Sequence, residues 1–264
     1  MSDPSQSERI NYKPIGYVHC DRSYRSEAPR QGVFANNSGT IELLPGHNFE
    51  TALRDLNSFD RIWIIFDFHL NKNWKPVVSP PIIGDRSKIG VFATRSPHRP
   101  CSIGMTCARL VSIDKLTLHI CDFDILDGSP VLDIKPYIPD SDSFPDASRG
   151  WLPEQHKSYQ VEIEPEVEQR MTWLLENGGP DLKNFSLTQL SNEPFNIKRK
   201  RVKQITTNQG TIHCRTWKMD FILKPDSDVV LVKAVESNYT AEELVPESPD
   251  PYNDKSLHRQ FLLL

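Results

Sequence analysis

Charged side chains stand beside turn residues in three short segments of this sequence. The segments are Ala28–Gln31, Gly90–Gly104 and Asp124–Tyr137. In the second segment Arg95 and Arg99 flank a proline and a histidine, and prolines stiffen a loop. Guanidinium groups recognise carboxylates and phosphates through forked hydrogen bonds. The spacing suggests a pre-organised anion site, although surface ion pairs with nearby aspartates are the commoner reason for such arginines.

The third segment offers two carboxylates, Asp124 and Asp127, around a turn at Gly128. A carboxylate there could attract a sulfonium, bind an amino group or a ribose, or act as a base. An aspartate before glycine also commonly bonds its own turn backbone, so both interpretations stay open. Lys135 could contact a phosphate or be an exposed strand residue.

A basic cluster is the strongest local charge feature of a chain whose formal net charge is -4. It consists of Lys198, Arg199, Lys200, Arg201 and Lys203. Because the chain as a whole is acidic, any RNA contact needs such a local patch. The cluster could neutralise phosphates, protect an edge strand from aggregation, or serve as a localisation signal.

The remaining reactive residue types indicate neither a metal site nor a thiol site. The five cysteines form no C-x-x-C pair, which favours a reducing compartment, and the eight histidines have no metal-ligand spacing. His69 ends a candidate strand, where core or rim positions are usual, and Cys101 is expected to be a small packing residue. The polar start and the absence of a long apolar run predict a cytoplasmic protein, with the nucleus as an alternative and no membrane partner.

The elements that must position these residues are mostly strands in the first half of the chain. The candidates are Pro14–Cys20, Gly39–Leu44, Arg61–His69, Ile89–Thr94, Ile103–Ile113, Leu116–Ile125 and Pro130–Tyr137. One helix is expected over Phe49–Asn57. Short strands close together favour a barrel or sandwich. A P-loop and a G-x-G-x-x-G turn are both missing from the sequence, which argues against the common nucleotide-binding sheet.

The second half predicts a mixture of helices and strands. Its candidates are helices over Pro165–Asn177 and Leu187–Asn192, a hairpin of Lys198–Ile205 with Thr211–Leu223 around Asn208-Gln209-Gly210, and a strand over Val229–Val235. The tail after Glu242 is polar until Phe261, so partial disorder is expected there.

Taken together, these segments resemble the tRNA (adenine-N6)-methyltransferase O family, as a eukaryotic-type member. The resemblance runs from Pro14-Ile15-Gly16 to Tyr137 and includes Pro29-Arg30-Gln31, Trp63-Ile64 and Phe68-His69. Its most specific parts are "GVFATRSPHRP", followed by Ile103-Gly104, and "LDGSPVLDIKPYIP".

The resemblance implies a mainly β protein: an N-terminal barrel that binds S-adenosylmethionine and a small C-terminal α+β domain, working as a homodimer. The expected division is 1–12 polar N-terminus, 13–140 barrel, 141–159 linker, 160–238 C-terminal domain and 239–264 tail. The implied reaction methylates N6 of threonylcarbamoyladenosine at tRNA position 37, without a metal.

The implied site residues fall into three groups. The cofactor group is Pro29, Arg30, Gln31, His69, Leu70, Arg95, Asp124, Ile125, Leu126 and Asp127. The candidate proton acceptor is Asp127 or Asp124. The tRNA group is Arg99, Lys135, Lys198, Arg199, Lys200 and Arg201.

The sequence departs from the family pattern at two places. Cys101-Ser102 stands where the family has Asn-Pro, and Glu193-Pro194-Phe195-Asn196 stands where bacterial members have Asp-Pro-Arg-Pro. A cysteine cannot replace the paired hydrogen bonds of an amide. The departures leave two alternative functions open: a methyltransferase with the same cofactor and another substrate, or a barrel that binds S-adenosylmethionine or RNA without catalysis.

Overall fold

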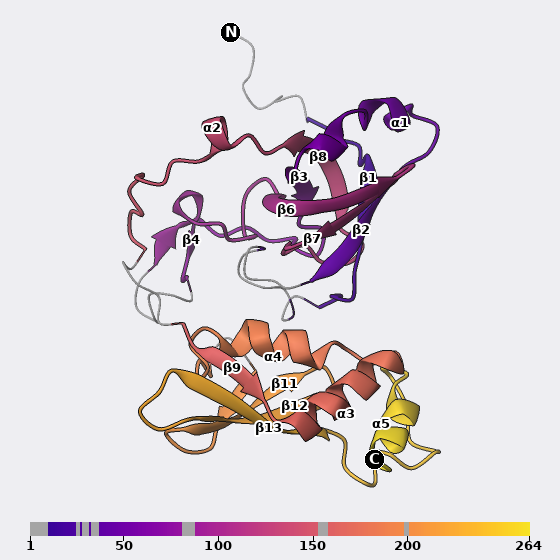
Figure 1. The fold of residues 1–264 in the computed structure, drawn as a ribbon, viewed down its shortest axis with the longest axis vertical. Coiled ribbons are helices and arrows are strands. Elements are labelled where there is room, and N and C mark those ends of the chain that lie inside the picture. Colours follow the sequence, from indigo (N-terminus) through magenta and orange to yellow (C-terminus); the bar gives the residue numbers. More distant parts are fainter. Residues whose placement is uncertain are drawn as a thin grey trace. The chain divides into compact units, whose positions relative to one another are not determined.

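The computed structural model describes residues 10–24, 27, 32, 37–80, 88–152, 158–197 and 201–264. These residues form two compact units (Figure 1). The first unit contains the described residues 10–20, 32, 38–80 and 88–144. The second unit contains residues 21–24, 27, 37 and the described chain from residue 145 onward.

The first unit is built on a closed barrel of six antiparallel strands in the order β1-β2-β7-β6-β3-β8. The strands are β1 Gly16–His19, β2 Ser38–Leu43, β3 Arg61–Asp67, β6 Ile103–Asp114, β7 Thr117–Cys121 and β8 Pro130–Pro136. Closure leaves no unpaired strand edge in the ring, and this confirms the expected barrel.

Alternating residues of the barrel strands fill its interior. In β3, Ile62, Ile64 and Phe66 are buried, whereas the residues between them face outward. Phe66 lies opposite Gly104 of β6, and a Cβ on Gly104 would stand 2.4 Å from the end of the Phe66 ring. The glycine that ends the motif is therefore a packing requirement of the core.

Short elements between the barrel strands differ in detail from the expected ones. The helix expected over Phe49–Asn57 is split into α1 Phe49–Ala52 and the 3-10 helix η2 Leu56–Ser58, because Asp55 adopts a left-handed conformation. The strand expected over Ile89–Thr94 is wrong beyond Gly90. It is β5 Ile89–Gly90, paired with β4 Val77–Val78, and then the 3-10 helix η4 Val91–Ala93. A single-turn helix, α2 Pro139–Asp142, follows β8.

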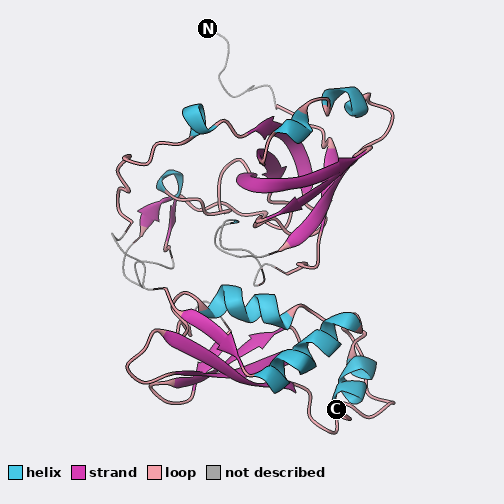
Figure 2. Ribbon diagram, in the orientation of Figure 1, coloured by secondary structure: helices cyan, strands magenta, loops and turns pink. Residues whose placement is uncertain are grey.

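The second unit is a five-stranded sheet in the order β10-β11-β12-β13-β9, with β9 parallel to β13. Its elements are β9 Gln160–Ile163, α3 Pro165–Glu176, α4 Leu182–Leu190, β10 Val202–Gln204, β11 Gln209–Cys214, β12 Trp217–Leu223, β13 Val229–Ser237 and α5 Lys255–Phe261. Figure 2 shows α3 and α4 on one side of this sheet.

Helix boundaries in this unit follow local signals. Pro165 opens α3 and Gly178, with φ 84°, follows its end. Asp181 caps α4 by accepting the Asn184 N–H at 2.9 Å, so the helix begins five residues before the expected Leu187.

Two expectations for the second unit are corrected. The strand expected over Thr211–Leu223 is two strands, because the chain reverses at Arg215, whose φ is 52°. The tail expected to be partly disordered contains α5, and Phe261 is fully buried in the core beside Trp217. Phe261, an apolar residue at the end of a polar stretch, is the sequence feature that could have indicated this packing.

Among the described residues, every helix is too short or too polar to cross a membrane.

Candidate functional site

The third motif and the end of β1 meet at one end of the barrel. The Gly128 N–H donates to the Val18 carbonyl at 2.8 Å, and the Val18 N–H donates to the Ser129 carbonyl at 3.0 Å. These backbone bonds fix the turn before β8 against β1. Pro29, Arg30 and Gln31 lie outside the described residues.

Asp127 is held by a partner far away in the sequence. Its Oδ1 accepts the Cys20 N–H at 3.0 Å, and His19 Nδ1 lies 3.9 Å from the same oxygen. The carboxylate is still 40% exposed. The bond to Cys20, the residue after β1, positions Asp127 while leaving it accessible, which suits a base or a ligand-binding group. No sequence pattern pointed to His19, because 108 residues separate it from Asp127.

His69 lies in the turn that follows β3 at the same end of the barrel. Its Nδ1 is 3.2 Å from Oγ of the buried Ser129, directly beside the Asp127 turn. The next residue, Leu70, is exposed. The structure therefore brings His69 close to the Asp127 turn, and both residues belong to the set that the resemblance assigns to the cofactor.

Residues 124–126, which precede Asp127, face the barrel interior in part. Ile125 is fully buried in the barrel core, and its carbonyl accepts the Cys20 Sγ–H at 3.7 Å. Its side chain is thus a packing residue, and only its backbone remains for a ligand. Asp124 and Leu126 are half-buried on either side of it.

The arginine motif forms part of a loop rooted at this end of the barrel, between β3 and β6. Arg99 Nη1 donates to the carbonyls of Thr94 at 2.7 Å and Val91 at 3.2 Å. Arg95 is exposed. Ion pairs of these two arginines with aspartates are not found among the described residues. Arg99 instead braces its own loop, a contact that sequence spacing did not indicate.

The departure at Cys101-Ser102 lies where this loop enters β6. The Ser102 carbonyl accepts the Phe68 N–H at 2.7 Å, and Ser102 Oγ donates to Asp67 Oδ1. Cys101 is exposed, so its expected packing role is wrong. Ser102 ties the start of β6 to the end of β3.

The described residues that are expected to contact tRNA come from both units. Lys135 is an exposed residue of β8 that forms an ion pair with Asp133 at 2.8 Å. Arg201 is exposed just before β10, in the second unit. Lys198, Arg199 and Lys200 lie outside the described residues. The second departure, Glu193–Asn196, is a turn in which Asn196 Nδ2 donates to the Glu193 carboxylate at 2.9 Å.

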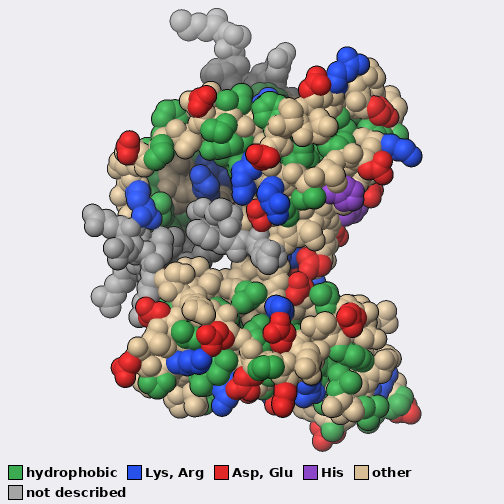
Figure 3. All heavy atoms as spheres, viewed as in Figure 1, with side chains coloured by type: hydrophobic (Ala, Val, Ile, Leu, Met, Phe, Trp, Pro, Cys, Tyr) green, Lys and Arg blue, Asp and Glu red, His purple; other side chains and the backbone are tan. Residues whose placement is uncertain are grey.

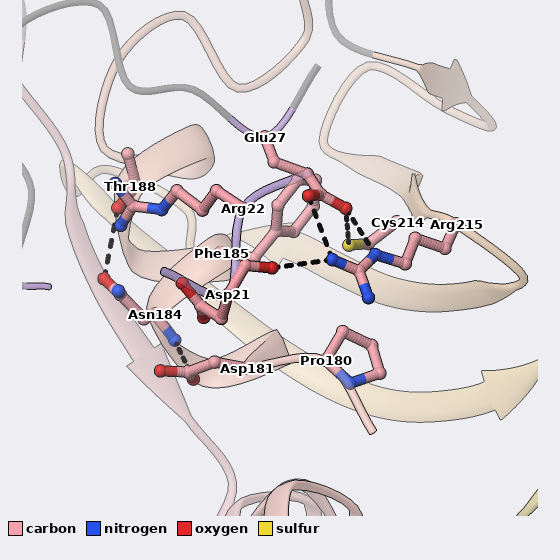
Figure 4. Close-up of a pocket in the computed structure, with 10 residues that line it drawn as sticks. All are labelled: Asp21, Arg22, Glu27, Pro180, Asp181, Asn184, Phe185, Thr188, Cys214 and Arg215. Carbon is pink, nitrogen blue, oxygen red and sulfur yellow. Dashed lines mark hydrogen bonds and ion pairs between the residues drawn. The ribbon is translucent and has the colours of Figure 1, made fainter. Parts of the chain in front are cut away.

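The second unit contains a pocket lined by residues from the β1–β2 connection, α4 and β11 (Figure 4). Inside it, Arg215 forms a two-armed ion pair with Glu27, with Nε–Oε1 at 2.6 Å and Nη2–Oε2 at 3.1 Å. Glu27 also accepts the N–H groups of Ser23 and Tyr24. Because Glu27 and Arg215 satisfy each other, their ion pair anchors Glu27 to the β11–β12 turn of the second unit.

Cys214 lines the same pocket without nucleophilic character. Burial raises the pKa of its thiol to about 12, and the neighbouring Glu27 carboxylate adds to the increase. A thiol with so high a pKa stays protonated at neutral pH.

The barrel fold and its end loops define a class of protein distinct from the doubly wound nucleotide-binding sheet. Two carboxylates, a histidine and an arginine loop stand at one end of a closed antiparallel barrel. The family model described as "tRNA-methyltransferase O N-terminal domain" matches residues 17–143.

Relatives cover most of the chain. The tRNA (adenine(37)-N6)-methyltransferase of Escherichia coli is 34% identical over 199 residues, 72% of this chain and 84% of that protein. A probable S-adenosyl-L-methionine-binding protein of Pyrococcus abyssi is 41% identical over 144 residues, 54% of this chain and 76% of that protein. A crystal structure of TrmO from P. aeruginosa matches with a TM-score of 0.67 and 26% identity, covering 87% of this chain and 99% of that chain. The chain therefore belongs to the tRNA-methyltransferase O family.

Proposed function

We propose that this protein transfers a methyl group from S-adenosylmethionine to N6 of threonylcarbamoyladenosine at position 37 of tRNA. The observation that carries the proposal is the meeting of Asp127, His69 and the root of the arginine loop at one end of the barrel. Family membership supports the cofactor and the class of reaction.

The described residues at this end fit the cofactor chemically. When bound, S-adenosylmethionine supplies an electrophilic methyl group on a positively charged sulfur. A half-exposed carboxylate anchored by a backbone N–H can hold a hydroxyl or amino group and favours nearby positive charge. Asp127 meets this description, and His69 contacts Ser129 two residues further along the same turn. The roles of Pro29, Arg30, Gln31 and Arg95 toward the cofactor remain predictions.

The substrate nitrogen is a weak nucleophile, because its lone pair is delocalised into the attached carbamoyl group. Two contributions from the chain address this weakness. The barrel end holds the reacting groups in line, which lowers the entropy cost. Asp127 accepts the proton of the nitrogen as the new bond forms, with Asp124 as the alternative acceptor. Neighbouring His19, 3.9 Å from Asp127, can pass that proton to solvent.

The test is incorporation of labelled methyl from S-adenosylmethionine into threonylcarbamoylated tRNA, compared with the same tRNA without that modification. Incorporation into the modified tRNA alone is expected. Incorporation into both would overturn the substrate assignment. Incorporation into neither, together with normal cofactor binding in a titration, would indicate another substrate or a barrel without catalysis.

We also propose that the protein works as a homodimer. Support comes from the outer face of the barrel, where Ile103 and Met105 of β6 are exposed beside Ile65 of β3. Apolar outer residues on adjacent strands suit burial against a second copy. Sedimentation equilibrium measures the mass directly, and a monomer at micromolar concentration would contradict the proposal. The cytoplasmic location remains a prediction.

A further inference from the structure

A loop that extends from the barrel between β3 and β6 has an unusual charge. The described residues 71–80 and 88–100 of this loop, called the arm here, contain Lys72, Lys75, Lys88, Arg95 and Arg99 and no aspartate or glutamate. The whole chain carries a formal net charge of -4. The arm is therefore a cationic projection on an acidic protein. Figure 3 shows Lys and Arg side chains on the visible face of the barrel unit, with apolar side chains and some Asp and Glu side chains among them.

Large aromatic side chains alternate with these cations. Phe92 is 76% exposed and Trp74 is 55% exposed. Trp74 stands between Lys72 and Lys75 in the sequence, and Phe92 stands between Lys88 and Arg95. Exposed aromatic rings are costly in water unless something covers them. Their placement among cations indicates a partner that has both flat apolar faces and negative charge.

The backbone of the arm is cross-linked by hydrogen bonds, so its exposed rings stand on a defined scaffold. The Lys75 N–H donates to the His98 carbonyl at 3.1 Å, and the Val91 N–H donates to the Pro76 carbonyl at 3.0 Å. Asn71 Nδ2 donates to the Pro97 carbonyl. These bonds join the outgoing and returning halves of the arm, which β4 and β5 also pair (Figure 1). A pre-organised surface loses less conformational entropy when it binds.

Phe92 is further positioned by Arg99. The guanidinium carbon of Arg99 lies 5.7 Å from the centre of the Phe92 ring, and its Nη1 is fixed to the carbonyls of Val91 and Thr94. The cation thus rests on one side of the ring. With the side chain 76% exposed, the ring keeps surface for a second flat group.

We propose that the arm binds an unpaired RNA loop, with Phe92 and Trp74 stacking on bases and the lysines neutralising adjacent phosphates. Base stacking on aromatic side chains, combined with cations along the backbone, is how proteins hold single-stranded nucleic acid. A duplex hides its base faces and would leave both rings uncovered. The inference rests on the proposed function, since it concerns the RNA loop that carries the target adenine.

The positive charge of the arm favours RNA over a second copy of the protein as the molecule that covers its exposed rings. A second copy of the arm would bring two sets of the same five cations together, at a cost in electrostatic repulsion. RNA supplies the opposite charge along its whole length, with salt-dependent affinity. The charge of the arm therefore favours RNA with unpaired bases as its binding partner.

The test is the dissociation constant of the full chain for a fluorescently labelled anticodon stem-loop RNA, measured by anisotropy beside a fully paired RNA of equal length. Replacing Phe92→Ala or Trp74→Ala is expected to weaken stem-loop binding roughly 5- to 150-fold each. Phe92→Tyr keeps a stacking ring and is expected to bind as the wild type does. Phe144→Ala is the matched control, because Phe144 is 73% exposed outside the arm.

Three outcomes would overturn the arm as an RNA site. The first is an unchanged stem-loop affinity in both alanine variants. The second is equal weakening in Phe144→Ala, and the third is a loss that sedimentation traces to a changed oligomeric state. Methyl transfer and cofactor titration are measured on the same variants. Failure of methyl transfer with arm-dependent RNA binding would reject the proposed function alone, and intact transfer with arm-independent binding would reject the arm alone.

Discussion

The two units of this protein use charged side chains in opposite ways. At the barrel end, Asp127 is tethered by one backbone N–H and remains 40% exposed. In the second unit, Glu27, Lys255 and His258 are buried among hydrogen-bond partners from their own unit. A buried charge must have its partners, because water cannot solvate it. A charge that is positioned and still accessible can act on another molecule.

The buried groups around α5 illustrate the structural use. Thr216 Oγ1 donates to Asp254 at 2.5 Å and lies 2.9 Å from His258 Nε2, and Ser237 Oγ lies 2.8 Å from His258 Nδ1. The network assigns the proton of a neutral His258 to Nε2, so that Ser237 donates to Nδ1. Trp217 stacks on the ring at 3.7 Å between centres. Every polar atom of His258 is thereby used to dock the C-terminal helix.

The largest effect is expected from a substitution of Asp127, the accessible carboxylate at the end of the barrel. Asp127→Asn keeps the hydrogen bond to the Cys20 N–H, because the amide oxygen can accept it, but removes the proton acceptor. The rate of methyl transfer is expected to fall about 10²- to 10⁴-fold, with tRNA affinity nearly unchanged. Single-turnover kinetics measure the rate and anisotropy measures the affinity. Normal turnover in this variant would mean that Asp124 or solvent, and not Asp127, accepts the proton.

The next effect tests the buried pair of the second unit. Arg215→Met leaves Glu27 buried without its cation, and the unit is expected to lose about 3–5 kcal/mol of unfolding free energy. Urea unfolding followed by tryptophan fluorescence reports it, since Trp217 lies in this core. The matched control is Lys183→Met, which breaks an exposed pair with Glu168 and is expected to cost at most about 1 kcal/mol.

A double variant sharpens this result. Combining Arg215→Met with Glu27→Leu removes both charges, so much of the lost stability should return. Equal losses in the single and the double variant would mean that the packing of the arginine stem matters more than its charge.

A smaller effect is expected when the barrel core is overpacked. Gly104→Ala places a methyl group against the Phe66 ring, which is buried and already in contact with Phe68. The expected cost is about 1–3 kcal/mol for the barrel alone. Hydrogen exchange separates the units, because protection should fall in β3 and β6 and not in β12. Gly90→Ala is the control, because a Cβ there meets no atom within 4 Å.

The smallest effect is a pH dependence confined to the second unit. Burial lowers the pKa of His258 below its ordinary value, although Asp254 and Asp250 oppose the shift. The unfolded chain therefore binds a proton at a higher pH than the folded one. Stability from this group is complete above about pH 6.5 and falls as the pH drops toward the lowered folded value, by at most about 1.4 kcal/mol per pH unit.

Unfolding of the wild type at pH 7.5 and pH 5.0 measures this loss. A His258→Gln variant is less stable at both values, but its stability should change less between them. An equal change in variant and wild type would assign the pH dependence to groups other than His258.

The local sequence was sufficient to predict those elements whose own residues show a periodic pattern or mark the ends of the element. The alternation of buried residues in β3 and the proline and glycine around α3 place those elements nearly as expected. The motifs around Arg95 and Asp127, which predicted the cofactor residues through the family resemblance, belong to connections at the same end of the barrel. Gly104, opposite Phe66, shows why a glycine of the motif is needed there, which spacing alone did not reveal.

The tertiary structure decided the contacts that join distant residues. Cys20 holds Asp127 across 107 positions, and Arg215 meets Glu27 across 188 positions. Neither pair leaves a periodic trace in the sequence, because a single long-range contact depends on strand order and not on local propensity. The polar tail after Glu242 was misjudged for the same reason: Phe261 and His258 gain their stability from Trp217, and that partner is brought to them only by the folded sheet.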